Sequence, residues 1–540
     1  MATGTIVSRV TGVARDIAAA AALGFYLVAD AFSLGNSLPN ILYILVIGGA
    51  LNAVFVPQLV RRMAEDDDDG RAYSDRLITL VGTVLLVLAI ISVIAAPLIV
   101  DLYTPADFPQ NEYDLAVAFA RLCLPQIFFY GLYTMLSQVL NARGHFGMPM
   151  FAPIANNIVA IATFVLFILV AGTSAAGDGV LTTDQVLILG IGTTLGVVVQ
   201  AVILLPILMR TGHVWRPRFD WRDAGLGKAG SLAAWTIGLV LVNQLTYLVI
   251  TRLATQANVN ASAAGVTAAG LTTYQKAHLV FMLPHSVITI SIVTAMLPAL
   301  SRLAHEGKFQ RVGHDVGSAM RIVAAMILPI AAMLVVVGSS VAVLLFGYGA
   351  ATPQQASIMG SIVSFFMLGL LPFTLFYVIL RGFYALEDTR TPFLITIVFS
   401  IAWLAMAVPL FNLVGDGGPQ VAMLALSYSL SYWIGMAIAW IVLARRLGGL
   451  DSRRTSWALA RMILATGVSI AVMIVVFALM SRFVTGTSLR VATDEKLPIL
   501  VNVIVVAACG LVAYIGAGRL FRVQEINEGI ALIQRKALRR

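Results

Sequence analysis

Apolar stretches of about 20 residues recur along the whole chain, and they constrain its fold more than any other feature. A stretch of that length crosses the hydrocarbon core of a bilayer as one α-helix. Long irregular or strand-like stretches are absent, as expected where each backbone polar group must bond within its own segment. The pattern therefore predicts an all-α polytopic membrane protein of about fourteen transmembrane helices. We place them at residues 4–30, 37–60, 77–100, 115–140, 150–172, 185–209, 231–254, 272–301, 318–345, 357–384, 391–413, 420–444, 457–481 and 497–518.

Composition excludes a soluble protein. Of the 540 residues, 59% are hydrophobic and 11% are charged, whereas soluble chains are about 25% charged. The two cysteines, Cys123 and Cys509, lie far apart in apolar segments, so no disulfide framework is indicated. We expect no cleavable signal peptide, because Arg9, Arg15 and Asp16 interrupt the first apolar region.

Basic residues are concentrated in alternate loops, and this predicts the orientation. One set of loops carries twenty-one of them, within residues 61–76, 143, 210–228, 302–321, 381–390 and 445–461. The other set carries four, namely Arg252, Arg482, Arg490 and Lys496. The excess places the first set and both termini in the cytoplasm. Since the net charge of +9 is distributed over membrane loops, we expect no nucleic-acid partner.

Short motifs recur at an offset of about 245 residues. Phe55–Met63 resembles Met296–Ala304, and Leu124–Tyr130 resembles Leu371–Tyr377. The first six helices and the next six are thus predicted to be two parallel copies, an arrangement that in transporters places the substrate site at the repeat interface. The predicted domains are an N-terminal six-helix lobe at 1–228, a C-terminal six-helix lobe at 229–450, helices 13 and 14 at 451–520 and a basic cytoplasmic tail at 521–540.

Charges within the first helix mark the candidate site. Ser8–Asp16 contains two arginines and a carboxylate, yet continues into the apolar segment Ile17–Ala29. A charge at membrane depth costs about 2.5–3.5 kcal/mol, so it persists where it faces a partner or a water-filled cavity. Arg9 and Asp16, seven residues apart, share a helix face, and we expect Asp16 to orient Arg9. The alternative is that the arginines extend to the membrane interface.

Further polar residues extend this predicted cavity. Asp30 is expected at the outer end of helix 1, Asn40 at the start of helix 2, and Lys276 in helix 8, where extension to the outer interface is the alternative. A cationic cavity suits a phosphate or carboxylate ligand. The candidate substrate-binding residues are Ser8, Arg9, Arg15, Asp16, Asp30, Asn40 and Lys276.

Other intramembrane polar groups are interpreted as structural. His278 and His285 are expected to be packed or at helix ends. Hydrogen bonds between helices are expected from Asn156, Asn157, Asn243 and Gln244. No HExxH, Walker loop or nucleophile elbow is present, so the chain is not expected to be an enzyme. We expect no catalytic residue, metal or cofactor. Because no nucleotide-binding domain is present, we expect membrane potential or ion coupling to supply the energy for transport.

Six motifs, in order, resemble the MurJ/MviN family of lipid II flippases, within the MATE-like exporter superfamily (MOP). They are SRVTGVARD at Ser8–Asp16, ADAF at Ala29–Phe32, LPN at Leu38–Asn40, GGALNAVFVP at Gly48–Pro57, MLPALS at Met296–Ser301 and GFYALEDTRTP at Gly382–Pro392. The resemblance spans roughly residues 1–520, and its variation is similar to that of actinobacterial members.

The resemblance implies a plasma-membrane flippase that serves peptidoglycan synthesis. Its substrate would be lipid II, the undecaprenyl-pyrophosphate-linked MurNAc-pentapeptide-GlcNAc, moved from the inner to the outer leaflet. It implies that Arg9, Arg15, Asp16 and Asp30 engage the pyrophosphate or gate the cavity, and that the helices at 457–518 hold the lipid tail. Membrane lipids and cell-wall synthesis or division proteins are the partners it suggests.

The chain departs from the family pattern at two positions. Where many members carry arginine in helix 2, it has Tyr43 and Ile44, and where they carry a cavity arginine in helix 8, it has Leu279. That Lys276 replaces this arginine is a hypothesis. Helix 7 also lacks a carboxylate, which disfavours sodium coupling and leaves membrane potential or proton coupling open.

Three other functions remain open at this stage. A flippase of another lipid-linked glycan would share the cationic cavity. A MATE-like drug exporter would favour an acidic, aromatic-lined one. A non-transporting scaffold for cell-wall assembly would not need intramembrane arginines, so Arg9→Ala and Arg15→Ala would be silent.

Overall fold

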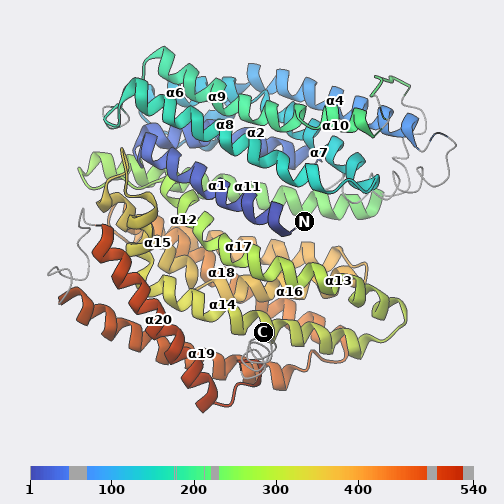
Figure 1. Cartoon of the computed structure of the whole chain (residues 1–540), viewed down its shortest axis with the longest axis vertical. Helices are drawn as coiled ribbons and strands as arrows, with labels where there is room; N and C mark the ends of the chain where they lie inside the picture. The colour runs from blue at the N-terminus through green and yellow to red at the C-terminus, as the bar shows by residue number, and fades with distance from the viewer. Residues whose placement is uncertain are drawn as a thin grey trace. The chain divides into compact units, whose positions relative to one another are not determined.

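The structure is a computed structural model of the chain (Figure 1), and it describes residues 2–47, 68, 70–175, 177, 179–211, 213, 215–220, 230–482 and 496–526. Within these residues all regular elements are helices, which confirms the predicted all-α class. Several features named above lie outside the described residues. They are the motif Gly48–Pro57, the end of the predicted span at 37–60, the repeat segment Phe55–Met63, the loop residues Arg61, Arg62, Arg222 and Lys228, Arg490 and most of the tail at 521–540.

Contacts divide the chain into two compact units. The first consists of Met1–Ala263, Gly270–Thr272 and Tyr348–Ala351, and the second of Ala264–Ala269, Thr273–Gly347 and Thr352–Arg540. Contacts thus place the helix that follows residue 229 with the first unit. The predicted division into six-helix lobes at 228/229 stays a prediction.

The described helices of the first unit, labelled as in Figure 1, range in length from the 6 residues of α10 to the 34 residues of α11. They are α1 (Ala2–Leu23), α2 (Leu27–Ile47), α4 (Arg71–Ile94), α5 (Ala96–Tyr103), α6 (Gln110–Cys123), α7 (Gln126–Ala142), α8 (Gly147–Ala171), α9 (Thr183–Val202), α10 (Leu205–Arg210) and α11 (Gly230–Ala263).

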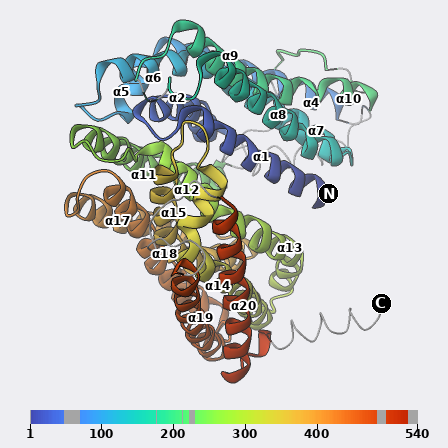
Figure 2. The same cartoon turned by 60° about the vertical axis from the view of Figure 1, so that its left-hand side comes forward.

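The second unit contains the remaining helices, of which α12 begins with two residues of the first unit. They are α12 (Leu271–Pro284), the π-helical turn η2 (His285–Thr289), α13 (Ile290–His305), α14 (Phe309–Phe346), α15 (Pro353–Met367), α16 (Leu370–Ala385), α17 (Arg390–Asn412), α18 (Gly418–Leu447), α19 (Ser452–Met480) and α20 (Lys496–Leu520). Figure 2 shows α14, α19 and α20 side by side, and buried Ala332, Val337, Met473, Phe477 and Val506 join them.

Most of these helices are long and apolar enough to span a membrane. The described residues contain eleven such helices, and counting the pair α15–α16, bent by 49°, as one span raises the number to twelve. These coincide with twelve of the predicted spans, and α1 and α2 overlap the first two. The polytopic helical fold is therefore confirmed, whereas the count of fourteen stays a prediction.

The first two helices meet earlier than predicted. The α1 helix ends at Leu23 and α2 begins at Leu27, because Gly24 adopts a φ of 60°, a left-handed conformation that glycine tolerates and that commonly ends helices. This corrects two predicted placements. Asp30 lies in the first turn of α2 rather than at the end of helix 1, and Asn40 lies inside α2 rather than at its start. Hydropathy could not indicate the break, because apolar residues continue across it.

An aromatic contact in the first unit holds α2 in place. The ring of Phe32 packs edge-to-face against Phe119 of α6 and Phe164 of α8, with centroid distances of 5.2 and 5.9 Å. All three rings are buried within one apolar cluster that also contains the end of α1. The helices α1 and α2, which bear the candidate polar residues, are thus packed against the rest of the first unit.

Candidate functional site

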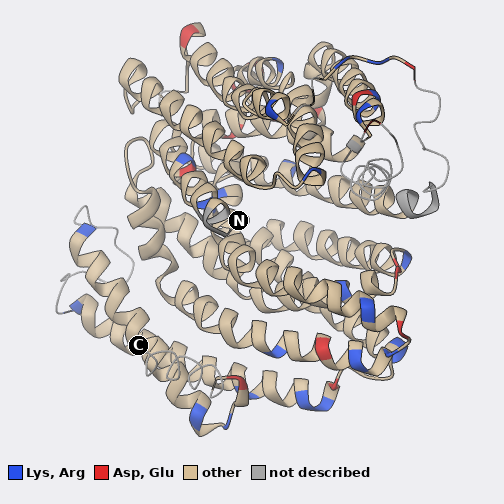
Figure 3. Cartoon of the chain, turned by 45° about the vertical axis from the view of Figure 1, so that its right-hand side comes forward, with Lys and Arg blue, Asp and Glu red and all other residues tan. Residues whose placement is uncertain are grey.

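Charged residues are sparse along the helices and gather mainly near their ends (Figure 3). Arg15 of α1 is an exception, and it is held in place by two neighbours. Its NH2 group forms an ion pair with Oδ2 of Asp16 at 3.2 Å, and its NH1 group donates to Oδ1 of Asn157 at 3.3 Å. The Asp16 side chain is 10% exposed and that of Arg15 is 36% exposed. The guanidinium is therefore anchored on one side and open on the other.

Asn157 of α8 connects this arginine to the rest of α1. Its Nδ2 donates to the Ser8 carbonyl at 3.2 Å and to Oγ1 of Thr11 at 3.0 Å, while its Oδ1 accepts from Arg15. Asn157 is 5% exposed. Its prediction as an interhelical hydrogen-bonding residue is confirmed. Its contact with Arg15 was missed, since no sequence spacing relates helix 5 to helix 1.

The Asp16 carboxylate forms an ion pair with the adjacent Arg15. The expectation that Asp16 also orients Arg9 stays a prediction. Arg9 is half-buried, and Asn40 is exposed on α2. Lys276 is half-buried on α12, in the second unit.

Asp30 is buried in a separate cluster of the first unit and accepts three hydrogen bonds. Its Oδ1 accepts from the Thr272 amide at 2.7 Å, and its Oδ2 accepts from the Leu271 amide at 3.1 Å and from Nδ2 of Asn258 at 2.8 Å. Those amides open α12, where a helix has no internal acceptors for them. Asp30 thus caps α12 and connects it to α2 and α11. The Asp30 residue is 1% exposed.

Two histidines of the second unit are packed, as the sequence predicted. His278 lies among Tyr274, Phe281 and Phe366, and its Nε2 lies 3.3 Å from the Tyr428 hydroxyl. His285 is 1% exposed in the π-helical turn. Gln244 likewise forms an interhelical hydrogen bond, from Nε2 to the Ile41 carbonyl at 3.3 Å.

A polar cluster at the loop end of the first unit escaped the sequence analysis. Nε2 of His213 lies 2.9 Å from Oδ1 of Asp75, and Nδ1 lies 2.9 Å from NH2 of Arg143. Because arginine can only donate, Nδ1 accepts and Nε2–H donates to the carboxylate, which makes the imidazole neutral. Burial lowers the pKa of His213 below its ordinary 6.5, and the positive charge of Arg143 acts in the same direction, against the raising effect of Asp75. The cluster joins α4, α7 and the segment after α10.

The sequence matches one family over most of its length. The family described as lipid II flippase MurJ matches residues 19–493. A probable lipid II flippase MurJ from Rhizobium tropici is 29% identical over 472 residues, which cover 87% of this chain and 84% of the relative. One from Vibrio cholerae is 26% identical over 478 residues, which cover 86% and 85%.

Solved structures share the fold. The structure of lipid II flippase MurJ in an inward closed conformation matches with a TM-score of 0.72 at 19% identity and covers 96% of this chain and 98% of that one. An inward-facing multidrug resistance MATE transporter of the MOP superfamily matches with a TM-score of 0.63 at 15% identity, covering 84% and 96%. Since the family match extends over far more than half of the residues, this chain belongs to the lipid II flippase MurJ family.

Proposed function

We propose that this protein is a lipid II flippase, which moves the undecaprenyl-pyrophosphate-linked precursor of peptidoglycan from the inner to the outer leaflet by alternating access. Family membership supports the substrate class. The membrane-spanning helices are consistent with transport rather than chemical catalysis. The tail of the lipid would stay in the bilayer while the polar head crosses inside the protein.

The geometry of Arg15 is the observation that carries this proposal. A guanidinium has five N–H donors in a planar fork. The described contacts occupy one with Asp16 and one with Asn157, which leaves donors on the exposed side. Such a fork matches the paired oxygens of a phosphate. The buried carboxylate of Asp16 orients Arg15, and the half-buried Arg9 lies on the same helix. Arg9, Arg15 and Lys276 would together bind the pyrophosphate.

Asp30 would contribute to closure rather than to direct binding. Its carboxylate oxygens are engaged by the first amides of α12 and by Asn258. Because three helices depend on this one carboxylate, it is suited to hold the outer end of the first unit together. The two predicted six-helix lobes would move against each other to give alternating access. The drive would be membrane potential or proton coupling, with no cofactor.

The protein would lie in the plasma membrane with both termini in the cytoplasm. The asymmetric distribution of basic loop residues supports this orientation. Membrane lipids would surround it, and cell-wall synthesis or division proteins would be its protein partners.

Translocation of lipid II in cells tests the proposal. The protein is supplied as the sole flippase to cells depleted of their own, and an externally added enzyme cleaves the lipid II that reaches the outer leaflet. Cleavage is expected with the wild-type protein, to be lost with Arg15→Ala and only partly restored with Arg15→Lys, because lysine keeps the charge but not the fork. Arg302→Gln, on an exposed helix end, serves as the matched control.

The other functions correspond to distinct results of the same assay. Normal membrane insertion without cleavage would point to another lipid-linked glycan, to a drug substrate or to the scaffold. Full cleavage with both Arg9→Ala and Arg15→Ala would contradict a role of these arginines in binding the pyrophosphate. Full activity of Lys276→Ala would contradict the hypothesis that Lys276 replaces the missing cavity arginine.

A further inference from the structure

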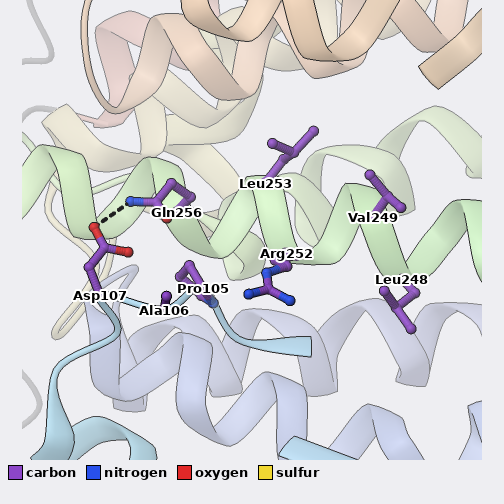
Figure 4. A pocket seen from close by; sticks show the side chains of 8 residues that line it. All are labelled: Pro105, Ala106, Asp107, Leu248, Val249, Arg252, Leu253 and Gln256. Carbon is purple, nitrogen blue, oxygen red and sulfur yellow. Dashed lines mark hydrogen bonds between the residues drawn. The ribbon is translucent and has the colours of Figure 1, made fainter. Parts of the chain in front are cut away.

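A cavity of about 450 Å³ lies in the first unit, away from Arg15 and Asp16 (Figure 4). It is formed by one side of α11 and by the loop that joins α5 to α6. Its lining is largely apolar. The residues are Pro105, Ala106, Asp107, Leu248, Val249, Arg252, Leu253 and Gln256. The predicted flippase mechanism uses none of them.

Arg252 supplies the positive charge of this cavity. Figure 4 shows its guanidinium on the side of α11 that faces Pro105 and Ala106. The side chain is exposed, and within the described part of the chain it forms no ion pair or hydrogen bond. Leu248 and Val249 lie one turn before it on the same side of the helix. An arginine beside apolar side chains therefore keeps all its donors for a ligand.

Asp107 supplies a negative charge at the edge of the same cavity. Its Oδ2 accepts a hydrogen bond from Nε2 of Gln256 at 2.8 Å, and the same nitrogen donates to Oδ1 of Asn260 at 2.9 Å. The first of these bonds connects the carboxylate to α11 at Gln256. Gln256 lies four residues beyond Arg252, which is about 6 Å along the helix axis. Arg252 and the Gln256 side chain that binds Asp107 thus lie at different positions along α11, beside the apolar residues of the lining.

One positive and one negative side chain beside an apolar lining match the two charges and the acyl chain of a zwitterionic lipid. The loop at Pro105–Asp107 follows α5 and the predicted span at 77–100, and Arg252 lies about one turn before Gln256 on α11, toward the predicted membrane interior. Toward the membrane interior, α5 exposes Leu98 and Leu102, and α11 exposes Leu241 and Leu245, the side chains that an acyl chain would contact. A free phosphate ion would gain nothing from the apolar lining, and an anionic lipid would gain nothing from Asp107.

We propose that this cavity binds a membrane aminophospholipid, with its phosphate on the Arg252 guanidinium, its ammonium on the Asp107 carboxylate and an acyl chain along Leu248. In the predicted orientation the lipid belongs to the outer leaflet. The site is independent of lipid II, because Arg9, Arg15 and Lys276 are not part of it. Binding and translocation can thus be tested separately.

Lipid binding to the purified, delipidated full-length protein tests the proposal. Native mass spectrometry would compare phosphatidylethanolamine with phosphatidylglycerol of the same acyl chains. The wild type should prefer phosphatidylethanolamine. Arg252→Gln should weaken that binding about tenfold, which corresponds to about 1.4 kcal/mol. Asp107→Asn should abolish the preference between the two lipids, and Arg302→Gln should change neither.

Two further measurements keep the result decisive. Ala106→Phe places a ring in the cavity from an exposed loop position and should reduce lipid binding without altering either charge. Excess inorganic phosphate should not displace the lipid. Equal or stronger binding of phosphatidylglycerol, competition by inorganic phosphate, or unchanged binding by Arg252→Gln in a folded protein would overturn the proposal.

Discussion

Asn157 illustrates how one buried amide can organise a charged site. An unsatisfied amide in a membrane helix is costly, so it must find partners, and here it finds them on α1 in Ser8, Thr11 and Arg15. The same three contacts fix the register of α1 against α8 and the direction of the guanidinium. A structural role and a binding role therefore coincide in one side chain.

Replacing Asn157 with alanine should reduce lipid II translocation severalfold while leaving the protein in the membrane. The substitution removes the NH1 anchor of Arg15 and leaves the Ser8 carbonyl with one partner fewer, and a membrane hydrogen bond contributes about 0.6 kcal/mol on average. Translocation would be measured with the external cleavage assay at matched protein levels. Asn156→Ala, the adjacent position on the same helix, is the control. Equal loss in both variants would show that Asn157 has no special role.

Gly270 is required by the buried carboxylate of Asp30. A Cβ at this position would lie 2.2 Å from Oδ2 of Asp30 and 2.5 Å from Cβ of Asn258. Gly270→Ala should therefore displace the cap of α12 and destabilise the protein by about 1–3 kcal/mol, the usual cost of overpacking. Thermal unfolding of the purified protein would measure this. Gly467→Ala on α19, where a Cβ meets nothing within 4 Å, should be neutral or stabilising.

At the scale of elements, helix breaks were the feature that hydropathy predicted least well. The predicted span at 272–301 contains α12, a π-helical turn and α13, and the span at 115–140 is divided between α6 and α7. Pro284 and Pro125 stand at these breaks, where proline removes a backbone donor and clashes with the preceding turn. A hydropathy pattern does not reveal such breaks, because a bent span contacts lipid with apolar residues just as a straight one does.

The contact between α4, α7 and the segment after α10 should weaken in acid. The pKa of His213 is lowered in the folded protein, so the unfolded chain binds the proton more readily and stability falls as the pH decreases below about 6.5. One proton limits this loss to about 1.4 kcal/mol per pH unit. Above that range the neutral imidazole and its two hydrogen bonds are fully retained.

His213→Gln tests this prediction, because glutamine keeps one donor and one acceptor but does not titrate. Melting temperatures of the wild type and of the variant would be compared at pH 7.5 and pH 5.5. The wild type should lose more stability on acidification than the variant. Identical losses would mean that protonation of His213 has no part in acid sensitivity, whereas groups that titrate in both proteins cancel in the comparison.

At the scale of the whole molecule, the distribution of basic residues makes a testable prediction about sidedness. Cysteines would be introduced in place of Ser174, between α8 and α9, and of His305, at the end of α13, after Cys123 and Cys509 are changed to serine. Both positions are exposed. A membrane-impermeant maleimide added to intact cells should label the cysteine at position 174 only. Labelling of position 305 alone would reverse the predicted orientation.

The sequence alone determined the helical membrane class and the family, because apolar stretches and ordered motifs are properties of the chain read in one dimension. It also indicated which charges in α1 demand an explanation. Only the tertiary structure decided their partners: Asp16 with Arg15, Arg15 with Asn157 across 142 residues, and Asp30 with the amides of α12. The physical reason is that hydrogen bonds and ion pairs extend over about 3 Å. Which groups come that close depends on how helices distant in sequence pack together.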